Sequence, residues 1–461
     1  MALLIGWVSV CNFNLVRPLP SGTSILGPYH AAPDVEFLYD LTFVRDGEQV
    51  VEQQIFDRIL RMIDQAERFV LIDMFLFNDE HGGDRDYIPL TNRLTDRLVS
   101  KRLQSPEIPV TFVTDEINTF YGAYRPAHFT ELEDAGVDVV LTDLTKLRDS
   151  NPAYAAVWRV FLQWFGTSGP AFLPHPLTSR GQKVTARSYL RLFNMKANHR
   201  KVIVTDKECL VTSANPHDAS SFHSNIAWVA RGGICRDIVD SERRIAEFSG
   251  TSLPTMTNLT SGDDLGGDVR ARFVTEGKIR ERVLSKIESV QPGDSIDVAM
   301  FYLSDRGIVR GLRRVAGAGA VVRLILDSNK DAFGRQKGGI PNRQVAYELD
   351  AMDGTEVRWY STHGEQFHTK LVIVKQPLEY TIFGGSANLT RRNLKNFNLE
   401  ADLEVVVPRG HSLIDRVDRY YARIWNNEGG EFTVPYDAYR DSSWIKKWIY
   451  RIQERTGLCS Y

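Results

Sequence analysis

The sequence predicts an α/β protein made of two similar halves, each a sheet with helices packed on both faces. The chain has 461 residues, which is long for a single hydrophobic core. Amphipathic segments alternate with short β-branched runs, as expected where helices and strands follow one another. The same order of segments occurs twice along the chain, and this alternation favours sheets that are covered by helices.

The first segment of the repeat is an amphipathic helix that leads into a buried strand. Residues 53–79 have apolar side chains at helical spacing and then an apolar run. Residues 277–305 repeat this pattern, and both ranges place a methionine at the same distance before their final aspartate. We therefore expect the two ranges to be equivalent elements of the two halves.

A second strand and a second helix follow in each half. Residues 110–122 and 322–334 both contain an aspartate followed at the same distance by a glycine. Residues 129–143 and 346–361 correspond more loosely, and both read as a helix followed by a strand. Each half thus has the order of elements that builds an α/β sheet.

Composition and repeat divide the chain into five regions. Residues 251–268 are rich in Pro, Gly, Ser, Thr and Asp, which is typical of a linker. This linker separates a first half at residues 36–250 from a second half at residues 269–430. Residues 1–35 are predicted to be an apolar tail and connector, and residues 431–461 a C-terminal amphipathic extension.

The charge balance does not favour nucleic acid as a partner. The chain has 56 Lys and Arg against 58 Asp and Glu. A protein that binds a duplex usually shows a basic surplus or stripe, and the sequence shows neither. The long-range field of the molecule therefore gives no reason to expect attraction to a polyanion.

The spacing of cysteines and acidic residues predicts neither a disulfide framework nor a metal centre. The four cysteines are scattered without close pairing, so we expect free thiols. They are Cys11, Cys209, Cys235 and Cys459. No cluster of Asp and His has metal-ligand spacing outside the motifs described below.

The N-terminus is apolar but short. Residues 1–11 have no basic residues ahead of the apolar run, and a spanning helix needs roughly 20 residues. This segment is either a clipped anchor or leader, or an ordered tail docked on the body. Since no other segment is long and apolar enough to cross a bilayer, membrane contact by the main body is expected to be peripheral.

Each half contains a histidine and a lysine two residues apart at the start of a β-branched run. They are His199 and Lys201 in the first half, and His368 and Lys370 in the second. Side chains two apart on a strand share a face, so each pair should point the same way. A lysine ammonium suits phosphate oxygens, and a neutral imidazole can act as nucleophile, base or acid. The pairs therefore favour phosphoryl chemistry.

A Ser-x-Asn turn follows each of these runs. Ser213 and Asn215 form it in the first half, and Ser386 and Asn388 form it in the second. Hydroxyl, amide and backbone N–H groups are donors suited to an anion. We expect these four residues to bind the substrate phosphate.

The pattern His-x-Lys-x4-Asp followed by Ser-x-Asn, present twice, resembles the phospholipase D superfamily. The resemblance covers most of residues 36–430. The first copy includes the motif aspartate, Asp206, whereas the second copy has Lys375 at this position. In the family this aspartate mainly supports its own loop, so Lys375 should change the geometry of the second half more than its chemistry.

The resemblance implies a fold of two α-β-α sandwich halves related by a pseudo-twofold axis, with one shared active site. The protein would then be a monomer that contains an internal pseudo-dimer. The resemblance also implies a double displacement through a phosphohistidine, without a metal or other cofactor.

An acidic residue distinguishes the two histidines. Glu400 lies in the second half where the first half has Ala227, when both are counted from a preceding asparagine. In the family an acidic residue at this position orients the histidine of the opposite half. The resemblance therefore implies that Glu400 orients His199, which would be the nucleophile, and that His368 is the general acid and base.

The leading functional prediction is a phospholipase D-like phosphodiesterase or phosphatidyltransferase, of the cardiolipin synthase type, that acts on phospholipids. One alternative is a nuclease or DNA-adduct phosphodiesterase of the same superfamily. A second alternative is a degenerate member that binds anionic lipid without turnover, which the Lys375 and Ala227 positions motivate.

Two aromatic segments favour phospholipid as the substrate. Residues 146–196 are an aromatic and apolar insertion with no counterpart in the second half, and added segments often determine specificity. Near the C-terminus, residues 442–453 place two tryptophans and three isoleucines on one helical face, with basic residues elsewhere. This pattern suits an interfacial helix on an anionic membrane. The alternative is a terminal helix that packs on the body or on a second subunit.

Overall fold

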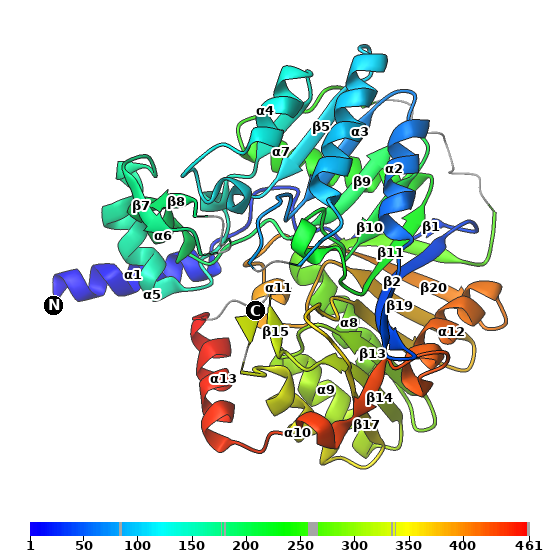
Figure 1. The fold of residues 1–461 in the computed structure, drawn as a ribbon. Coiled ribbons are helices and arrows are strands. Elements are labelled where there is room, and N and C mark those ends of the chain that lie inside the picture. The colour runs from blue at the N-terminus through cyan, green and yellow to red at the C-terminus, as the bar shows by residue number, and fades with distance from the viewer. Residues whose placement is uncertain are drawn as a thin grey trace.

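Two large sheets, each formed mainly by one half of the chain, form the centre of the protein (Figure 1). The structure is a computed structural model, and it describes residues 1–82, 85–176, 178, 181–256, 266–332, 335–336 and 338–458. The first sheet has the strand order β3-β2-β11-β10-β9-β4-β5-β6, and the second has the order β1-β12-β20-β19-β18-β13-β14-β17-β21. The predicted α/β fold with two similar halves is confirmed.

The strands of the two sheets have these bounds. The first sheet contains β2 (Glu36–Arg45), β3 (Glu48–Glu52), β4 (Val70–Met74), β5 (Val110–Thr114), β6 (Asp138–Leu141), β9 (Lys201–Thr205), β10 (Cys209–Thr212) and β11 (Asn225–Ala230). The second contains β1 (His30–Ala31), β12 (Arg270–Thr275), β13 (Ser295–Met300), β14 (Val321–Asp327), β17 (Thr355–Tyr360), β18 (Lys370–Lys375), β19 (Glu379–Gly385), β20 (Ala401–Pro408) and β21 (Thr433–Pro435).

The helices follow the strands in the order that the repeat predicts. The first half contains α2 (Ile55–Gln65), α3 (Leu90–Gln104), α4 (Ala127–Asp134) and α7 (Gly233–Phe248). The second contains α8 (Glu276–Ser289), α9 (Arg306–Gly317), α10 (Asn342–Asp350), α11 (Arg391–Leu394) and α12 (Ser412–Asn426). The remaining helices are α1 (Ala2–Val16), α5 (Pro152–Val157), α6 (Ala186–Leu192) and α13 (Trp444–Thr456), and two small hairpins pair β7 (Ala171–Pro174) with β8 (Lys183–Thr185) and β15 (Asp331–Ala332) with β16 (Arg335–Gln336).

Corresponding strands pair in the same way in both sheets. β4, β5 and β6 run parallel, as do β13, β14 and β17, while β9 and β18 run antiparallel to β4 and β13. Each parallel step requires a crossover, which α3 and α4 supply in the first half and α9 and α10 in the second. The starts of β9 and β18 therefore lie at the carboxyl ends of parallel strands, with Lys201 opposite Met74 and Lys370 opposite Met300.

One hydrophobic core joins the two halves. A single buried cluster includes Phe37 and Trp228 from the first sheet, Tyr360 and Leu403 from the second, and Phe367 from the segment before β18. Two further clusters lie within one half each, around the helices that cover its sheet. Because the shared core lies between the sheets, it holds the edges of the two halves in a defined arrangement.

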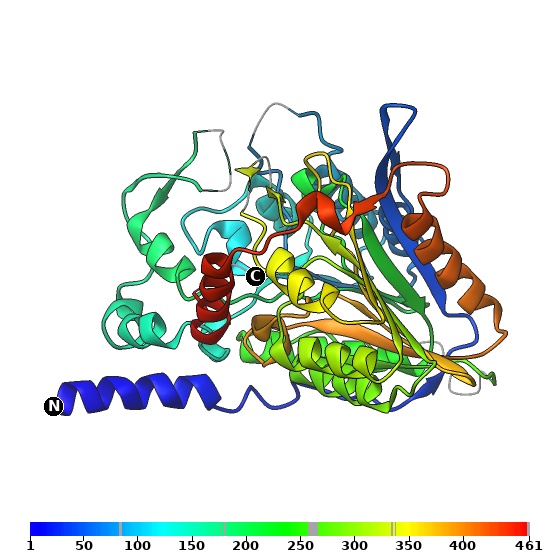
Figure 2. The ribbon, with the colours of Figure 1, turned by 90° about the horizontal axis from the view of Figure 1, so that it is seen from below.

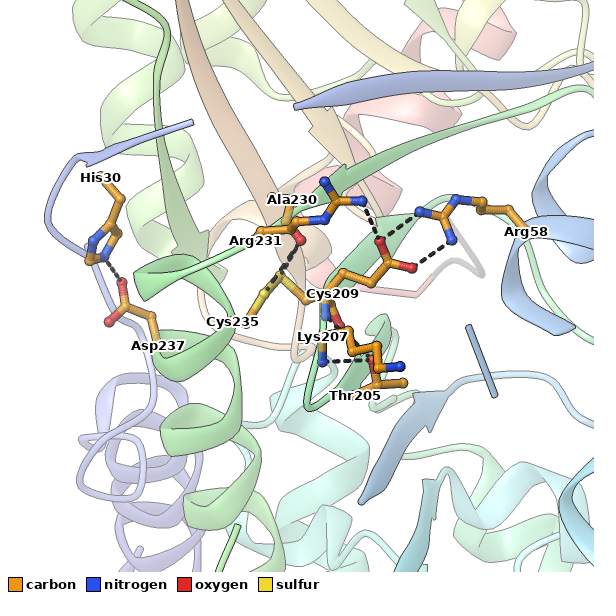
Figure 3. The surroundings of a disulfide bond; sticks show 10 residues. His30, Arg58, Thr205, Lys207, Cys209, Ala230, Arg231, Cys235 and Asp237 are labelled. Atoms are coloured by element: carbon orange, nitrogen blue, oxygen red, sulfur yellow. Dashed lines mark hydrogen bonds and ion pairs between the residues drawn. A yellow bond between two sulfur atoms is a disulfide. The ribbon is translucent and has the colours of Figure 1, made fainter. Parts of the chain in front are cut away.

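A disulfide between Cys209 and Cys235 corrects the expectation that all cysteines are free thiols (Figure 3). The two Cα atoms are 5.3 Å apart, although the residues are 26 apart in sequence. Packing of the start of α7 against β10 brings them together, and sequence spacing does not show this contact. Cys11 is a free thiol. The prediction for Cys459 lies outside the described residues, as does part of the predicted linker, residues 257–265.

The aromatic insertion and both terminal helices lie on one side of the molecule, at the left in Figures 1 and 2. α1 packs against α5, where the Cys11 thiol donates to the Pro152 carbonyl oxygen at 3.3 Å. Within the described part of the chain, no helix combines the length and the apolar character needed to cross a bilayer.

Candidate active site

Two short bridges between the halves bring the His-Lys motifs to one junction. Asn198 pairs in parallel with Leu399, and Ser224 pairs in parallel with Phe367. The His199 N–H donates to the Leu399 carbonyl at 2.9 Å. In each half, therefore, the residue before the motif histidine lies against the segment that leads into an inner strand of the other half, β20 or β11. This exchange is the same in both directions, as expected for a pseudo-twofold relation.

His199 is held by a carboxylate from the opposite half. Its Nδ1 lies 2.9 Å from Oε2 of Glu400, and Glu400 is completely buried. The Ser386 hydroxyl donates to the same carboxylate at 2.6 Å, and the Asn393 amide donates to its other oxygen. Because a carboxylate accepts, we assign the ring hydrogen to Nδ1, which leaves Nε2 with its lone pair.

His368 is held by a neutral amide instead. Its Nδ1 lies 3.1 Å from Oδ1 of Asn225, which also accepts from the Ser213 hydroxyl at 3.0 Å. The Asn225 amide nitrogen donates to the His223 carbonyl at 3.0 Å, and this contact sets the orientation of the amide. His368 therefore has the same tautomer as His199, with a partner that lacks charge.

The structure corrects the predicted match between Glu400 and Ala227. Ser213 N donates to the Ile226 carbonyl, and Ser386 N donates to that of Ala401, so Ile226 and Ala401 are equivalent. The residues that precede them, Asn225 and Glu400, are therefore equivalent as well. Twelve residues separate Ser213 from Asn225, and fourteen separate Ser386 from Glu400. Two additional residues in the second half therefore shift the alignment, and Ala227 lies in the hydrophobic core of β11.

Both lysines are buried in matching surroundings. Lys201 Nζ donates to the His199 carbonyl at 2.8 Å, and Lys370 Nζ donates to the His368 carbonyl at 2.7 Å. Each ammonium lies 5.1 Å from the ring centre of a phenylalanine that follows a parallel strand, Phe75 for Lys201 and Phe301 for Lys370. The same two phenylalanine rings lie beside the histidines. The ring centres of Phe75 and His199 are 4.8 Å apart, and those of Phe301 and His368 are 5.0 Å apart.

Burial and the two lysines keep the histidines neutral. Burial lowers the pKa of His199 well below its usual value, and the charges of Lys201 and Lys370 lower it further. The pKa of His368 is also lowered well below its usual value by burial, and then by Lys370, His223, Lys201 and His199. Since each ring is affected by charges from both halves, the two motifs share one electrostatic environment.

Burial also shifts the other ionisable groups of the site toward their neutral forms. It lowers the pKa of Lys201 to about 7, against the opposing charge of Glu400. It raises the pKa of Glu400 to about 8, although both motif lysines lower it. An anionic phosphate placed among these groups would favour the charged lysines, because an opposite charge stabilises the ionised form.

Two of the predicted phosphate ligands, Ser213 and Ser386, contact the residues that hold the histidines. The hydroxyls of Ser213 and Ser386 donate to Asn225 and Glu400, and so they support the histidines through these partners. The Oδ1 atom of Asn388 is buried and has no hydrogen-bond partner among the described residues. Direct contact of these side chains and of Asn215 with a phosphate stays a prediction.

Asp206 lies away from the histidines, at the far end of β9. Its Oδ1 accepts from the backbone N–H groups of Glu67 and Arg68 at 2.9 and 3.1 Å, so it supports the turn that leads into β4. Lys375, at the equivalent end of β18, contacts Asp297 at 2.7 Å and Asp418 at 2.5 Å. An ion pair therefore replaces the loop contacts in the second half, far from the motif histidine.

Sequence reasoning did not identify the aspartates that support the residues before the histidines. Asp115 Oδ2 accepts from Asn198 N at 2.6 Å, and Asp327 Oδ2 accepts from Phe367 N at 2.8 Å. The sequence did indicate them, because both aspartates occupy the same position of a repeated segment, at the carboxyl ends of the corresponding strands β5 and β14. Phe75 and Phe301 carried a similar signal, since each follows the repeated methionine.

The two halves meet at their paired His-Lys motifs, in the arrangement that the resemblance of the sequence implies. Residues 283–425 match the family model described as "Cardiolipin synthase, PLD-like domain". None of the curated proteins compared with this sequence matches it.

A solved structure of similar length shows the same fold, and others match parts of it less well. The crystal structure of phosphatidylserine synthase from Haemophilus influenzae Rd KW20 is similar with a TM-score of 0.58 and 11% identity, over 97% of both chains. Polyphosphate kinase from Porphyromonas gingivalis matches 92% of this chain and 56% of its own, at 10% identity and a TM-score of 0.43. Nuc from Salmonella typhimurium, a phospholipase D family member, matches 36% of this chain and 98% of its own, at 20% identity and a TM-score of 0.27. Residues 283–425 therefore match a PLD-like domain, and the chain as a whole shares its fold with the phosphatidylserine synthase structure.

Proposed function

We propose that the protein is a phosphodiesterase or phosphatidyltransferase that acts on phospholipids through a phosphohistidine at His199. The observation that carries this proposal is the pair of neutral histidines with the same tautomer, each beside a lysine, at one junction. Glu400 distinguishes them, because it gives only His199 a carboxylate partner.

In the first step, Nε2 of His199 attacks the phosphorus, and the bond from phosphorus to the leaving alcohol oxygen breaks. The bound anionic phosphate raises the pKa of His368, so that Nε2 of this ring takes up a proton from solvent and then gives it to that oxygen. Glu400 stabilises the positive imidazole ring that forms at His199. Lys201 and Lys370 stabilise the charged phosphate oxygens, which is the main protein contribution in phosphoryl transfer.

In the second step, an acceptor oxygen bonds to the phosphorus, its proton passes to His368, and the bond from phosphorus to nitrogen breaks. Water as the acceptor gives hydrolysis, and an alcohol gives phosphatidyl transfer. The description of the family model that matches residues 283–425, "Cardiolipin synthase, PLD-like domain", supports a transfer reaction of the cardiolipin synthase type.

The test is an assay of the purified protein with a chelator present, on phosphatidylglycerol, phosphatidylcholine and single-stranded DNA in parallel. We expect turnover of phospholipid, with cardiolipin among the products from phosphatidylglycerol. Acid quenching of a reaction with phosphate-labelled lipid should leave label on the peptide that contains His199. Turnover of DNA alone, or of nothing, would overturn the proposal.

A further inference from the structure

A basic cavity lies between α13 and the helices α8, α9 and α11 of the second half. Its volume is about 790 Å³. Among the described residues that line it are six arginines and two lysines, against two carboxylates. The whole chain has a net charge of −2, so the cavity is a local concentration of positive charge on a nearly neutral protein.

Three of these cations are not used by the fold. Arg310, Lys395 and Arg455 are exposed and have no ion-pair partner within the described part of the chain. Other lining cations are paired, for example Arg280 with Asp305 at 3.0 Å and Arg451 with Glu348 at 2.9 Å. The unpaired charges point to an anion that is not part of the protein.

The two carboxylates of the cavity do not balance this charge. Asp305 caps α9 by accepting from the N–H groups of Gly307 and Ile308, in addition to its contact with Arg280. Glu454 contacts the Ser304 hydroxyl, and burial raises the pKa of its carboxyl group, which favours the neutral form. The cavity therefore keeps a positive potential.

Helix α13 has an exposed apolar side next to the cavity. Trp448 lines the cavity and is 63% exposed. Four more apolar side chains of α13 are between 41% and 70% exposed, namely Trp444, Ile445, Ile449 and Ile452. Tyr450 and Glu454 are buried and hold the other side of the helix against the body. The apolar side is therefore not a packing face for any of the described residues.

We propose that the basic cavity and the exposed side of α13 form a docking site for an anionic lipid bilayer. The cavity holds the phosphate of a lipid head group, and the tryptophans and isoleucines enter the interface, where amphipathic aromatic rings are favoured. This proposal rests on the proposed phospholipid substrate, and it adds a binding site separate from the histidines. A soluble polyanion would use the cations but would leave the apolar side without a role.

The charge of the site is tested with the triple variant Arg310→Gln, Lys395→Gln, Arg455→Gln in the full chain. No ion pair of the described structure is lost, so the unfolding temperature should stay as in the wild type. We expect wild-type protein to sediment with vesicles of phosphatidylcholine mixed with phosphatidylglycerol, and less as salt increases. The triple variant should lower the partition constant on the order of 100-fold, given the usual effect of each basic residue near a charged membrane.

A matched control removes the same charge elsewhere. Arg61 in α2 and Arg416 and Arg419 in α12 do not line the cavity, and α2 and α12 lie on the opposite side of the molecule in Figure 1. Their combined change to Gln should reduce vesicle binding far less than the cavity variant does. Equal effects of the two triple variants would show general electrostatic attraction and would overturn the docking site.

Two further measurements separate the sources of failure. Trp448→Ser should weaken binding to the mixed vesicles. If the wild type instead binds single-stranded DNA or inorganic phosphate as well as it binds the vesicles, the cavity is a site for soluble anions. Hydrolysis of soluble bis(p-nitrophenyl) phosphate should be the same in the cavity variant and the wild type. If the protein hydrolyses no phosphodiester but the cavity variant still loses vesicle binding, the proposed reaction fails and the docking site stands.

Discussion

The orientation of the two histidine rings depends on single side chains from the opposite half. Glu400 accepts from His199, and Asn225 accepts from His368, at equivalent positions of the two halves. A carboxylate can stabilise a positively charged imidazole ring far better than an amide can. The difference of one functional group is therefore the physical basis for assigning different tasks to the two histidines.

Glu400→Gln is expected to slow formation of the phosphohistidine by roughly 100-fold or more, because the charge that stabilises the ring at His199 is lost. Substrate binding should change much less. The measurement is a single-turnover reaction with acid quenching and peptide mapping. Asn225→Asp is the matched change in the other half, and the label should stay on His199 in that variant. Label on His368 in the wild type would reverse the assignment.

At the scale of elements, buried polar contacts connect strands to the helices beside them. Asp40, in β2, accepts from the first N–H groups of α2 at Gln54 and Ile55, at 2.7 and 3.1 Å. The disulfide connects β10 to the first turn of α7. Both contacts lie outside the His-Lys motifs and hold elements together, so their effect on stability can be tested by unfolding.

Asp40→Asn is expected to reduce the loss of stability with rising pH. Burial raises the pKa of Asp40 to about 7, above its value in the unfolded chain. The folded state therefore favours the protonated form, and the stability it contributes at low pH is lost as pH rises through about 7. Between pH 5 and 8 the wild type should lose on the order of 2–3 kcal/mol more than the variant.

The measurement for this variant is urea unfolding at several pH values. The amide oxygen of Asn can still accept from both N–H groups, so the helix start should be kept. Parallel pH profiles for the two proteins would contradict the prediction, since all other titrating groups are common to both.

Loss of the disulfide is expected to lower the free energy of unfolding by roughly 3 kcal/mol, given the length of the chain segment that it closes. The comparison is between wild type and the variant Cys209→Ala, Cys235→Ala by guanidinium unfolding. Cys11→Ala is the control, because Cys11 is a free thiol and should change stability little. A reductant should lower the stability of the wild type and leave the double variant unchanged.

At the scale of the whole molecule, the shared core makes one site from two halves. The core contains side chains of both sheets, and the Tyr360 hydroxyl of the second half donates to the Thr42 carbonyl of the first at 2.7 Å. Arg423 in α12 contacts both carboxylate oxygens of Glu52 in β3 at 2.7 and 2.8 Å. Neither half has both histidines, so the proposed chemistry depends on this packing.

His199→Ala and His368→Ala are each expected to abolish turnover of a phosphodiester. The rate of the double variant should be no lower than that of the less active single variant. Residues that act as one unit give losses that do not add. The measurement is kcat/KM for bis(p-nitrophenyl) phosphate and for phospholipid vesicles. Additive losses would indicate two independent sites, and a near-normal rate for either variant would remove that residue from the mechanism.

Local patterns in the sequence were enough to predict the α/β halves, the two His-Lys pairs and the acidic residue Glu400. Strand and helix periodicity depends on neighbouring residues, and so it is readable without the tertiary structure. Roles in catalysis for these residues stay predictions, as do the boundaries of the two halves. The exposed apolar side of α13 was also visible as a stripe of tryptophan and isoleucine, but whether it packs on the body was not.

Only the tertiary structure decided which residues meet across the chain. It showed that Asn225 rather than Ala227 is the counterpart of Glu400, because two additional residues before Glu400 shift the count along the sequence. It paired Cys209 with Cys235, and it placed Asp206 at the far end of its strand from His199. Each of these contacts depends on how sheets and helices pack, and packing is determined by the whole set of buried side chains, which spacing along the chain does not encode.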